Sequence, residues 1–338
     1  MKKKLPIIGI TMGDPVGIGP EIIFSALEDP AIYDLCRPVV FGDFAALENA
    51  KKYTGSKLKI LPVDKPDAKV FRHGIINLIN LSELDPCKII PAKPTPQTGR
   101  VMVDYIKAAA DMAVSGNIAG ITTCPINKVA MQMGGSEFTG HTELLANQTK
   151  STNFVMMLAG DRLRVALVTI HKPLKQVHKI ISEEKILQTI QIVNTSLQER
   201  FGFKNPVIAV AGLNPHAGEN GIFGDEEKRI IAPAIDRAVK EGINVKGAFP
   251  PDTVFYHAIN GKYHAVICMY HDQGLIPFKL IHFKDGVNTT LGLPIIRTSV
   301  DHGTAYDIAG TGKADPGSLL AAIRMAADHG RNFFSRGI

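Results

Sequence analysis

Three short apolar runs that each end in a histidine constrain the fold of this chain most strongly. The runs cover residues 164–171, 207–216 and 265–271, and their histidines are His171, His216 and His271. Runs of this length, rich in β-branched residues, are typical of buried strands in a parallel sheet. The carboxyl ends of such strands meet at one edge of the sheet, where ligands bind. We therefore expect the three histidines to converge, although they lie far apart in the sequence.

Three neutral imidazoles that leave coordination positions open form a typical catalytic metal site. The alternative is that each histidine only caps a strand through hydrogen bonds. Two of the histidines lie in polar loops, within residues 214–219 and 271–274, and this setting favours the metal. The sequence thus predicts a divalent metal bound by His171, His216 and His271.

The rest of the chain alternates short apolar runs with helical patterns, which predicts a mostly parallel α/β sheet. Helices are expected after Ser182, where apolar residues recur at helical spacing, and over about 99–114 and 225–241. The proline-rich stretch from 64 to 97 is expected to be irregular. Strands are expected at residues 6–11, 38–41, 119–123, 154–158, 165–170, 207–211 and 265–269.

Length, charge and cysteine content narrow the class of protein. A chain of 338 residues suffices for two domains or one large α/β unit. No stretch approaches the roughly 20 apolar residues of a membrane span, and none of the four cysteines forms a Cys-x-x-Cys pair. We therefore expect free thiols in the cytoplasm. The net charge of +6 is scattered, which argues against nucleic acid and favours attraction of a small anionic substrate.

Two loops precede expected helices and are candidates for ligand binding. Gly17 and Gly19 follow the first strand but lack the third glycine of a dinucleotide-binding fingerprint, so a standard Rossmann loop is not expected. A turn that only shapes the active cleft is the alternative. Residues 138–143 offer backbone N–H groups to an anion, with His141 and Thr142 as added donors. A plain helix cap is the alternative there.

The last third of the chain carries two isolated cations and a glycine-rich loop. Lys279 and Arg297 have apolar neighbours. A solvated surface position is the alternative for Lys279, whereas Arg297 is expected to meet a substrate carboxylate or phosphate. Residues 302–318 are too irregular for a strand or helix, and a loop of this kind can wrap an adenosine. Ser318 is expected to cap a final helix.

These residues resemble a known family. The final loop, with its His-Gly-Thr-Ala-x-Asp-Ile-Ala-Gly motif, is similar to the adenosine-binding loop of the isocitrate and isopropylmalate dehydrogenase superfamily. Within it, nearly the whole chain resembles the 4-hydroxythreonine-4-phosphate dehydrogenase family. The matching motifs lie in order along the chain, at residues 13–21, 138–143, 213–219, 269–274, 291–299 and 302–318.

The resemblance implies an α/β/α fold of two lobes with the active cleft between them. We expect a terminal lobe of residues 1–130 and 284–338, holding the NAD adenosine loop 302–318. The central lobe, 131–283, would hold the metal histidines and the dimer interface. The resemblance also implies a homodimer whose metal ligands come from both subunits, in place of convergence within one chain.

The resemblance further implies the roles of individual residues. His171, His216 and His271 would bind one divalent metal, with zinc preferred by ligand type and cobalt or magnesium as alternatives. Lys279 and His216 are the expected catalytic residues. The substrate would be held by His141, Thr142, Lys279, Asn288 and Arg297. The cofactor would be bound by His302, Gly303, Asp307 and Gly310. Because the Asp307 carboxylate accepts hydrogen bonds from ribose hydroxyls and repels a 2'-phosphate, NAD is preferred to NADP.

The implied reaction is oxidation of 4-hydroxythreonine 4-phosphate by NAD at the C3 hydroxyl, whose pKa a Lewis acid lowers. Decarboxylation to 3-amino-2-oxopropyl phosphate would follow, in pyridoxal 5'-phosphate biosynthesis. The alternative substrate is 4-phospho-D-threonate or D-erythronate, in sugar-acid catabolism. A metal-dependent hydrolase or aldolase, or a non-catalytic metal- or phosphate-ester-binding protein, would also use the histidines. Neither class needs the adenosine-like loop.

Overall fold

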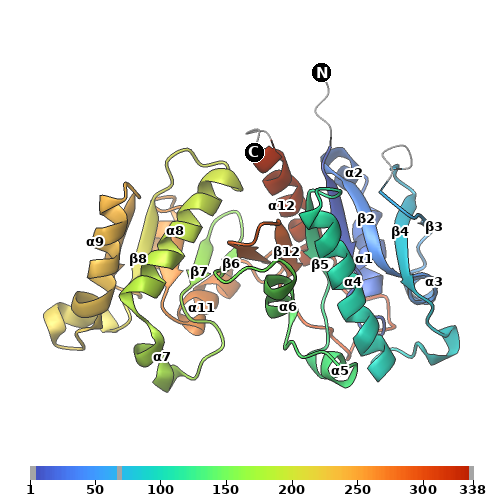
Figure 1. Ribbon diagram of the computed structural model, residues 1–338, viewed down its shortest axis with the longest axis horizontal. Helices are drawn as coiled ribbons and strands as arrows, with labels where there is room; N and C mark the ends of the chain where they lie inside the picture. Colours follow the sequence, from blue (N-terminus) through green and yellow to red (C-terminus); the bar gives the residue numbers. More distant parts are fainter. Residues whose placement is uncertain (1–4, 67–70, 335–338) are drawn as a thin grey trace. The chain divides into compact units, whose positions relative to one another are not determined.

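A computed structural model describes residues 5–66 and 71–334 (Figure 1). The chain divides into two compact units: the terminal unit, Met1–Thr152 with Leu293–Ile338, and the central unit, Asn153–Gly292. The chain therefore passes from one unit to the other after Thr152 and again after Gly292, whereas the sequence predicts these two boundaries near residues 130 and 283. The first crossing comes late because α6 (His141–Gln148) packs on α4 (Pro96–Val114) of the terminal unit.

The sheet of the terminal unit is parallel throughout, in the order β3-β4-β2-β1-β5-β12. One face is covered by α4, and α1, α3 and α12 pack together on the other (Figure 1). The strands are β1 (Ile7–Thr11), β2 (Arg37–Asp43), β3 (Lys59–Pro62), β4 (Ile75–Ser82), β5 (Gly120–Thr123) and β12 (Arg297–Val300). The other helices are α1 (Gly19–Leu27), α2 (Ala31–Leu35), α3 (Phe44–Thr54), η1 (Pro86–Lys88), α5 (Lys128–Met133) and α12 (Gly317–Phe334).

The sheet of the central unit is mixed, in the order β11-β6-β7-β10-β8-β9. β6 runs antiparallel to β11 and β7, and the remaining pairs are parallel. The strands are β6 (Val155–Ala159), β7 (Arg164–Leu167), β8 (Ile208–Ala211), β9 (Val245–Phe249), β10 (Ala265–Cys268) and β11 (Val287–Leu291). The helices are α7 (Leu174–Ile180), α8 (Glu183–Glu199), η2 (Pro215–Gly221), η3 (Glu227–Ile231), α9 (Ala232–Lys240), α10 (Val254–Ile259) and α11 (His271–Ile281).

The α/β class predicted from the sequence is confirmed, and so are most of its elements. The Ser182 hydroxyl accepts a hydrogen bond from the Lys185 N–H at 3.2 Å and starts α8 as predicted. The expected helix over 225–241 divides instead into the π-helical η3 and α9. The prediction that residues 64–97 are irregular was wrong in part, because β4 lies within this range and pairs with β2 and β3. Ser318 lies inside α12, and its hydroxyl accepts from the Asp301 N–H rather than capping the helix.

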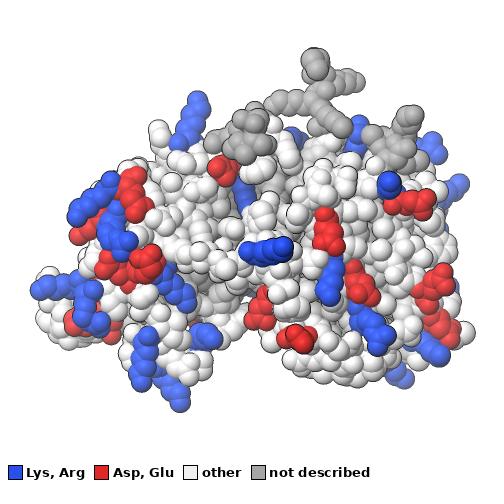
Figure 2. Space-filling view, in the orientation of Figure 1, with Lys and Arg blue, Asp and Glu red and all other residues white. Residues whose placement is uncertain are grey.

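No helix in the described part of the chain is long and apolar enough to cross a membrane. On the face in view in Figure 2, basic and acidic side chains are interspersed rather than gathered by sign. The scattered charge expected from the sequence is therefore visible on this face.

Candidate active site

Two of the three expected metal ligands lie together in the central unit. The parallel strands β7, β10 and β8 are neighbours, so the three histidine-bearing segments leave the same edge of the sheet. His171 follows β7, and His271 is the first residue of α11, directly after β10. Their ring centroids are 5.6 Å apart. The strand pattern therefore brings two imidazoles within reach of a common ligand.

His271 also has the outer partner that a metal-binding histidine requires. Its Nδ1 lies 2.7 Å from Oδ1 of Asp272. A carboxylate at one ring nitrogen fixes the tautomer and leaves the other nitrogen as a metal donor. The residues present thus fit an imidazole-bound divalent metal.

His216 lies apart from this pair within one chain. In residues 5–66 and 71–334, no three histidine, cysteine or acidic side chains lie close enough together to share a metal. The His216 Nδ1 is instead 4.0 Å from Oε2 of Glu219, and its side chain is largely exposed. His171 and His271 thus lie together within one chain, whereas His216 follows β8 on a left-handed turn that no sequence pattern indicated.

Two further residues assigned to the substrate lie in the central unit. Lys279 lies on α11, the helix that begins with His271, and its Nζ is 5.5 Å from the ring centroid of Phe283. Asn288 lies on β11, and its Oδ1 is buried without a hydrogen-bond partner among the described residues. A buried amide oxygen of this kind favours a ligand that donates a hydrogen bond.

Arg297 supplies a buried positive charge in the terminal unit. It begins β12, is only 2% exposed, and donates from Nη2 to Oγ1 of Thr123 at 2.9 Å. Burial lowers its pKa to about 10, so it is still a cation at neutral pH. A buried guanidinium is best stabilised by an anion such as a carboxylate or phosphate.

His141 shares this positive environment at the first residue of α6. Its Nε2 is buried without a hydrogen-bond partner among the described residues. Burial, with the nearby positive charges of Arg297 and Lys128, holds the pKa of His141 well below its usual value of 6.5. A neutral imidazole thus lies beside two cations at the start of a helix, where backbone N–H groups favour anions. Thr142, the other expected donor, is the next residue of the helix.

Lys128 is a residue that sequence reasoning missed. It begins α5, which Asn127 caps by accepting a hydrogen bond from the Ala130 N–H at 2.7 Å. A Cβ on Gly140 would meet its Cε at 3.6 Å, so the lysine side chain passes beside the start of α6. The only signal in the sequence is an isolated lysine after an N-cap asparagine.

The expected cofactor loop is hydrogen-bonded to Glu21, in the first turn of α1, and to Asp14, in the glycine-rich loop between β1 and α1. The Glu21 carboxylate accepts hydrogen bonds from the Gly310 N–H at 2.6 Å and the Gly312 N–H at 2.7 Å. The Tyr306 hydroxyl donates to Asp14, whose pKa burial raises. Sequence reasoning gave no role to these two acids, although both lie in a motif that it noted. These hydrogen bonds hold the expected cofactor loop against the start of α1 and the glycine-rich loop before it.

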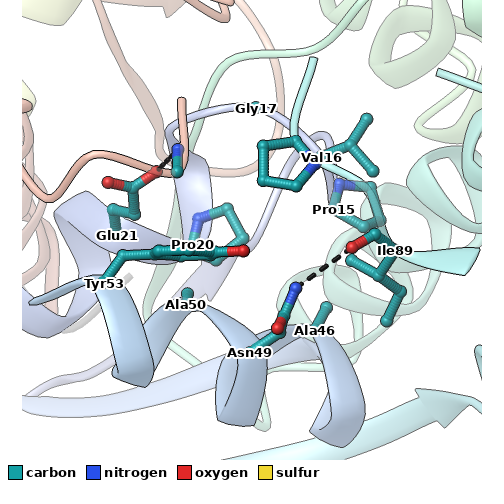
Figure 3. Close-up of a pocket in the computed structure, with 12 residues that line it drawn as sticks. Pro15, Val16, Gly17, Pro20, Glu21, Ala46, Asn49, Ala50, Tyr53 and Ile89 are labelled. Carbon is teal, nitrogen blue, oxygen red and sulfur yellow. Dashed lines mark hydrogen bonds between the residues drawn. The ribbon is translucent and has the colours of Figure 1, made fainter. Parts of the chain in front are cut away.

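A small pocket is lined in part by Glu21 and Gly310, which form this attachment (Figure 3). Tyr53 and Asn49 of α3 face the loop from Pro15 to Pro20, and a dashed line marks the hydrogen bond that Glu21 accepts. On the cofactor loop itself, His302, Gly303 and Asp307 are exposed. These three residues are therefore open to a ligand, whereas Gly310 is held by Glu21.

Comparison with known proteins identifies the family of this chain. A family model described as pyridoxal phosphate biosynthetic protein PdxA matches residues 34–326. A 4-hydroxythreonine-4-phosphate dehydrogenase of Desulforapulum autotrophicum is 57% identical over 327 residues, 97% of this chain and 96% of that protein. A D-threonate 4-phosphate dehydrogenase of Pectobacterium atrosepticum is 43% identical over 95% of this chain and 98% of its own.

A solved structure has the same fold over nearly the full length. The 4-hydroxythreonine-4-phosphate dehydrogenase of Klebsiella pneumoniae superposes with a TM-score of 0.90 at 41% identity, covering 98% of this chain and 99% of that chain. The family match, the near full-length relatives and the shared fold agree with one another. The chain therefore belongs to the PdxA family of pyridoxal phosphate biosynthetic proteins.

Proposed function

We propose that this chain is a metal-dependent 4-hydroxythreonine-4-phosphate dehydrogenase that uses NAD and acts in pyridoxal 5'-phosphate biosynthesis. The observation that carries the proposal is the 57% identity, over nearly the full length, to a 4-hydroxythreonine-4-phosphate dehydrogenase. The relative that acts on D-threonate 4-phosphate is more distant, at 43%. The buried Arg297 beside His141 supports an anionic substrate.

The reaction we propose oxidises the C3 hydroxyl and then removes the carboxylate as CO2. The C3 hydride passes to NAD, and the hydroxyl proton passes to a basic side chain, for which Lys279 is the candidate. The resulting β-keto acid loses CO2 and takes up a proton, which gives 3-amino-2-oxopropyl phosphate. The net products are this aminoketone, CO2 and NADH.

His171, His216 and His271 would hold one divalent metal. Imidazole donors suit zinc or cobalt better than magnesium, so zinc is the proposed metal. When bound, a divalent cation acts as a Lewis acid that lowers the pKa of a coordinated hydroxyl. The 5.6 Å separation of the His171 and His271 rings and the Asp272 carboxylate at His271 support this assignment.

We assign substrate binding to five residues. Arg297, His141 and Thr142 would bind anionic groups of the substrate, and Asn288 and Lys279 would complete the set. The low pKa of His141 keeps its imidazole neutral, so it would donate a hydrogen bond to the anion rather than supply a charge.

The terminal unit would also bind the cofactor through the loop over 302–318. The exposed Asp307 carboxylate would accept hydrogen bonds from the adenosine ribose and repel a 2'-phosphate. His302 and Gly303, also exposed, and Gly310 would contact the same nucleotide. A KM for NADP below that for NAD would refute this choice of cofactor.

The central unit would form a homodimer with a second copy of this chain. Ile276, Leu280 and Phe283 recur at helical spacing along and just beyond α11 and are 61%, 83% and 76% exposed. Ile222 and Phe223, close to His216, are exposed as well. Large exposed apolar side chains favour a protein interface. In such a dimer, His216 of one subunit would complete the metal site formed by His171 and His271 of the other subunit. This arrangement accounts for the separation of His216 from those two histidines within one chain.

The main alternative is oxidation of 4-phospho-D-threonate or D-erythronate, which the 43% identity to a D-threonate 4-phosphate dehydrogenase keeps open. The proposed cytoplasmic location is supported by four free cysteines, three of them buried. The reaction is tested by measuring CO2 together with NADH. We expect equal amounts of both, and NADH without CO2 would contradict the decarboxylation.

A further inference from the structure

The segment that carries His216 has an unusual backbone. His216, Ala217, Gly218, Glu219 and Asn220 have φ angles of +52°, +54°, +81°, +42° and +57°. L residues disfavour this left-handed region, and a run of four of them with one glycine does not form from local preference. Contacts from elsewhere in the chain must therefore hold the turn.

The buried carboxylate of Glu227 makes those contacts at the base of the turn. Its Oε1 accepts hydrogen bonds from the Leu213 N–H and the Asn214 N–H, each at 2.7 Å. Its Oε2 accepts a third from Nδ2 of Asn214 at 3.0 Å. Charge-assisted hydrogen bonds to backbone N–H groups are stronger than neutral ones. The carboxylate thus fixes the two residues from which the chain enters the turn.

The turn is also packed directly against this carboxylate. A Cβ on Gly218 would lie 2.8 Å from Oε2, and a Cβ on Gly212 would lie 3.1 Å from Oε1. Gly218 combines this close approach with a φ of +81°, so only glycine fits there without strain. Glu227 therefore contacts the chain both before and within the turn.

The helix that presents Glu227 has an unusual geometry as well. Glu227 begins η3, a π-helical segment that continues into α9, and Ile230 and Ile231 of that segment are buried. Single π-helical turns are frequent at functional sites, where they aim a side chain that an α-helix would place elsewhere. The neighbouring Glu226 accepts a hydrogen bond from Nδ2 of Asn214 at 2.8 Å, so both acids hold that side chain.

We infer that Glu227 is a positioning residue for the metal ligand His216: its carboxylate holds the left-handed turn and thereby the orientation of the imidazole. The inference rests on the metal role of His216 proposed above. It assigns to Glu227 no contact with substrate, cofactor or metal. Residues that orient metal ligands typically change metal affinity by roughly 10- to 100-fold when replaced.

The test uses the full-length protein stripped of metal and titrated with Co²⁺. Glu227→Gln removes the negative charge and places an NH2 group opposite Nδ2 of Asn214, where Oε2 accepts a hydrogen bond, while the remaining oxygen faces the Leu213 and Asn214 N–H groups. We expect a rise in the Co²⁺ Kd of about tenfold or more and an altered visible absorption band of the bound ion. Asp225→Asn, the matched control, alters an exposed ion pair with Arg229 and should keep the wild-type Kd and band. A wild-type Kd and band for Glu227→Gln overturn the inference.

Two further variants make the result decisive. Gly218→Ala inserts a methyl group against the Glu227 carboxylate and should change the Co²⁺ band in the same direction, so it replaces Glu227→Gln if that variant does not fold. His216→Ala separates the two claims. If it loses Co²⁺ while Glu227→Gln and Gly218→Ala do not, only the positioning role fails. If it binds Co²⁺ like the wild type, the metal role of His216 fails and the inference fails with it.

Discussion

The imidazole rings of His171 and His271 lie with their centroids 5.6 Å apart, although they belong to segments distant in the sequence. The sheet accounts for their proximity, because β7 and β10 are parallel neighbours with Val165 paired to Val266. Parallel strands in register deliver the residues that follow them to the same edge. The metal proposed for this protein depends on that relationship.

Replacing either histidine of this pair should remove the metal. For His271→Ala we expect the Zn²⁺ Kd, measured by calorimetry on chelator-treated protein, to rise at least about a hundredfold, because one of few coordinate bonds is lost. His178→Ala, on the exposed side of α7, is the matched control and should bind Zn²⁺ like the wild type. Retention of full Zn²⁺ affinity by His271→Ala would rule out the metal site.

The buried guanidinium of Arg297 should contribute to substrate binding through its planar geometry. Arg297→Lys keeps the charge but loses the paired N–H donors, so we expect kcat/KM for the phosphorylated substrate to fall roughly 10- to 100-fold, or about 1.5–3 kcal/mol. The KM for NAD should not change. Arg324→Lys, which alters an exposed ion pair with Asp29, serves as the control. Equal kcat/KM in Arg297→Lys and the wild type would remove Arg297 from the substrate site.

The depressed pKa of His141 should make stability depend on pH. Below the usual value of 6.5 the unfolded chain binds a proton at His141 that the folded chain does not. The free energy of unfolding therefore decreases as pH falls below 6.5, by about 1.4 kcal/mol per pH unit from this group, until the folded-state pKa is reached.

The measurement is chemical denaturation of the metal-free protein between pH 7 and about 5, for wild type and His141→Asn. We expect a smaller loss of stability on acidification in His141→Asn, because the difference between the two slopes isolates one histidine from the others. Identical slopes in the two proteins would show that His141 is protonated as readily in the folded state as in the unfolded state.

Glu21 should affect cofactor binding without contacting the cofactor. Glu21→Gln loses one of the two acceptors that hold the Gly310 and Gly312 N–H groups, so the loop should be less ordered. We expect the KM for NAD to rise about two- to tenfold, consistent with the net 0.5–1.5 kcal/mol of one hydrogen bond, while kcat at saturating NAD is kept. Glu28→Gln, exposed at the end of α1, is the control. A lowered kcat with an unchanged KM for NAD contradicts this role.

The sequence predicts those features that arise from local patterns. The Ser182 cap with its apolar stripe predicts α8, and the apolar runs predict β7, β8 and β10, because strand and helix periods are visible within a few residues. β4 was not predicted, because its apolar residues do not alternate with polar ones and prolines lie on both sides of it. The same strand pattern predicts that the three histidines follow their strands at one edge of the sheet, because parallel strands end at the same edge.

The remaining features depend on contacts between distant residues. The left-handed backbone at His216 depends on Glu227, and the position of the cofactor loop depends on Glu21 and Asp14, which precede it by most of the chain length. The neighbourhood of Lys128, His141 and Arg297 likewise forms only when α5, α6 and β12 pack in one unit. Local propensity carries no signal for such contacts.

The most direct test of the proposed function is NADH formation by the purified, Zn²⁺-loaded protein. The assay compares 4-hydroxythreonine 4-phosphate with 4-phospho-D-threonate and 4-phospho-D-erythronate, by absorbance, under identical conditions. We predict the highest kcat/KM for 4-hydroxythreonine 4-phosphate. A higher kcat/KM for either sugar-acid phosphate would contradict the proposed substrate and assign the chain to sugar-acid catabolism, and no NADH with any of the three would contradict the dehydrogenase itself.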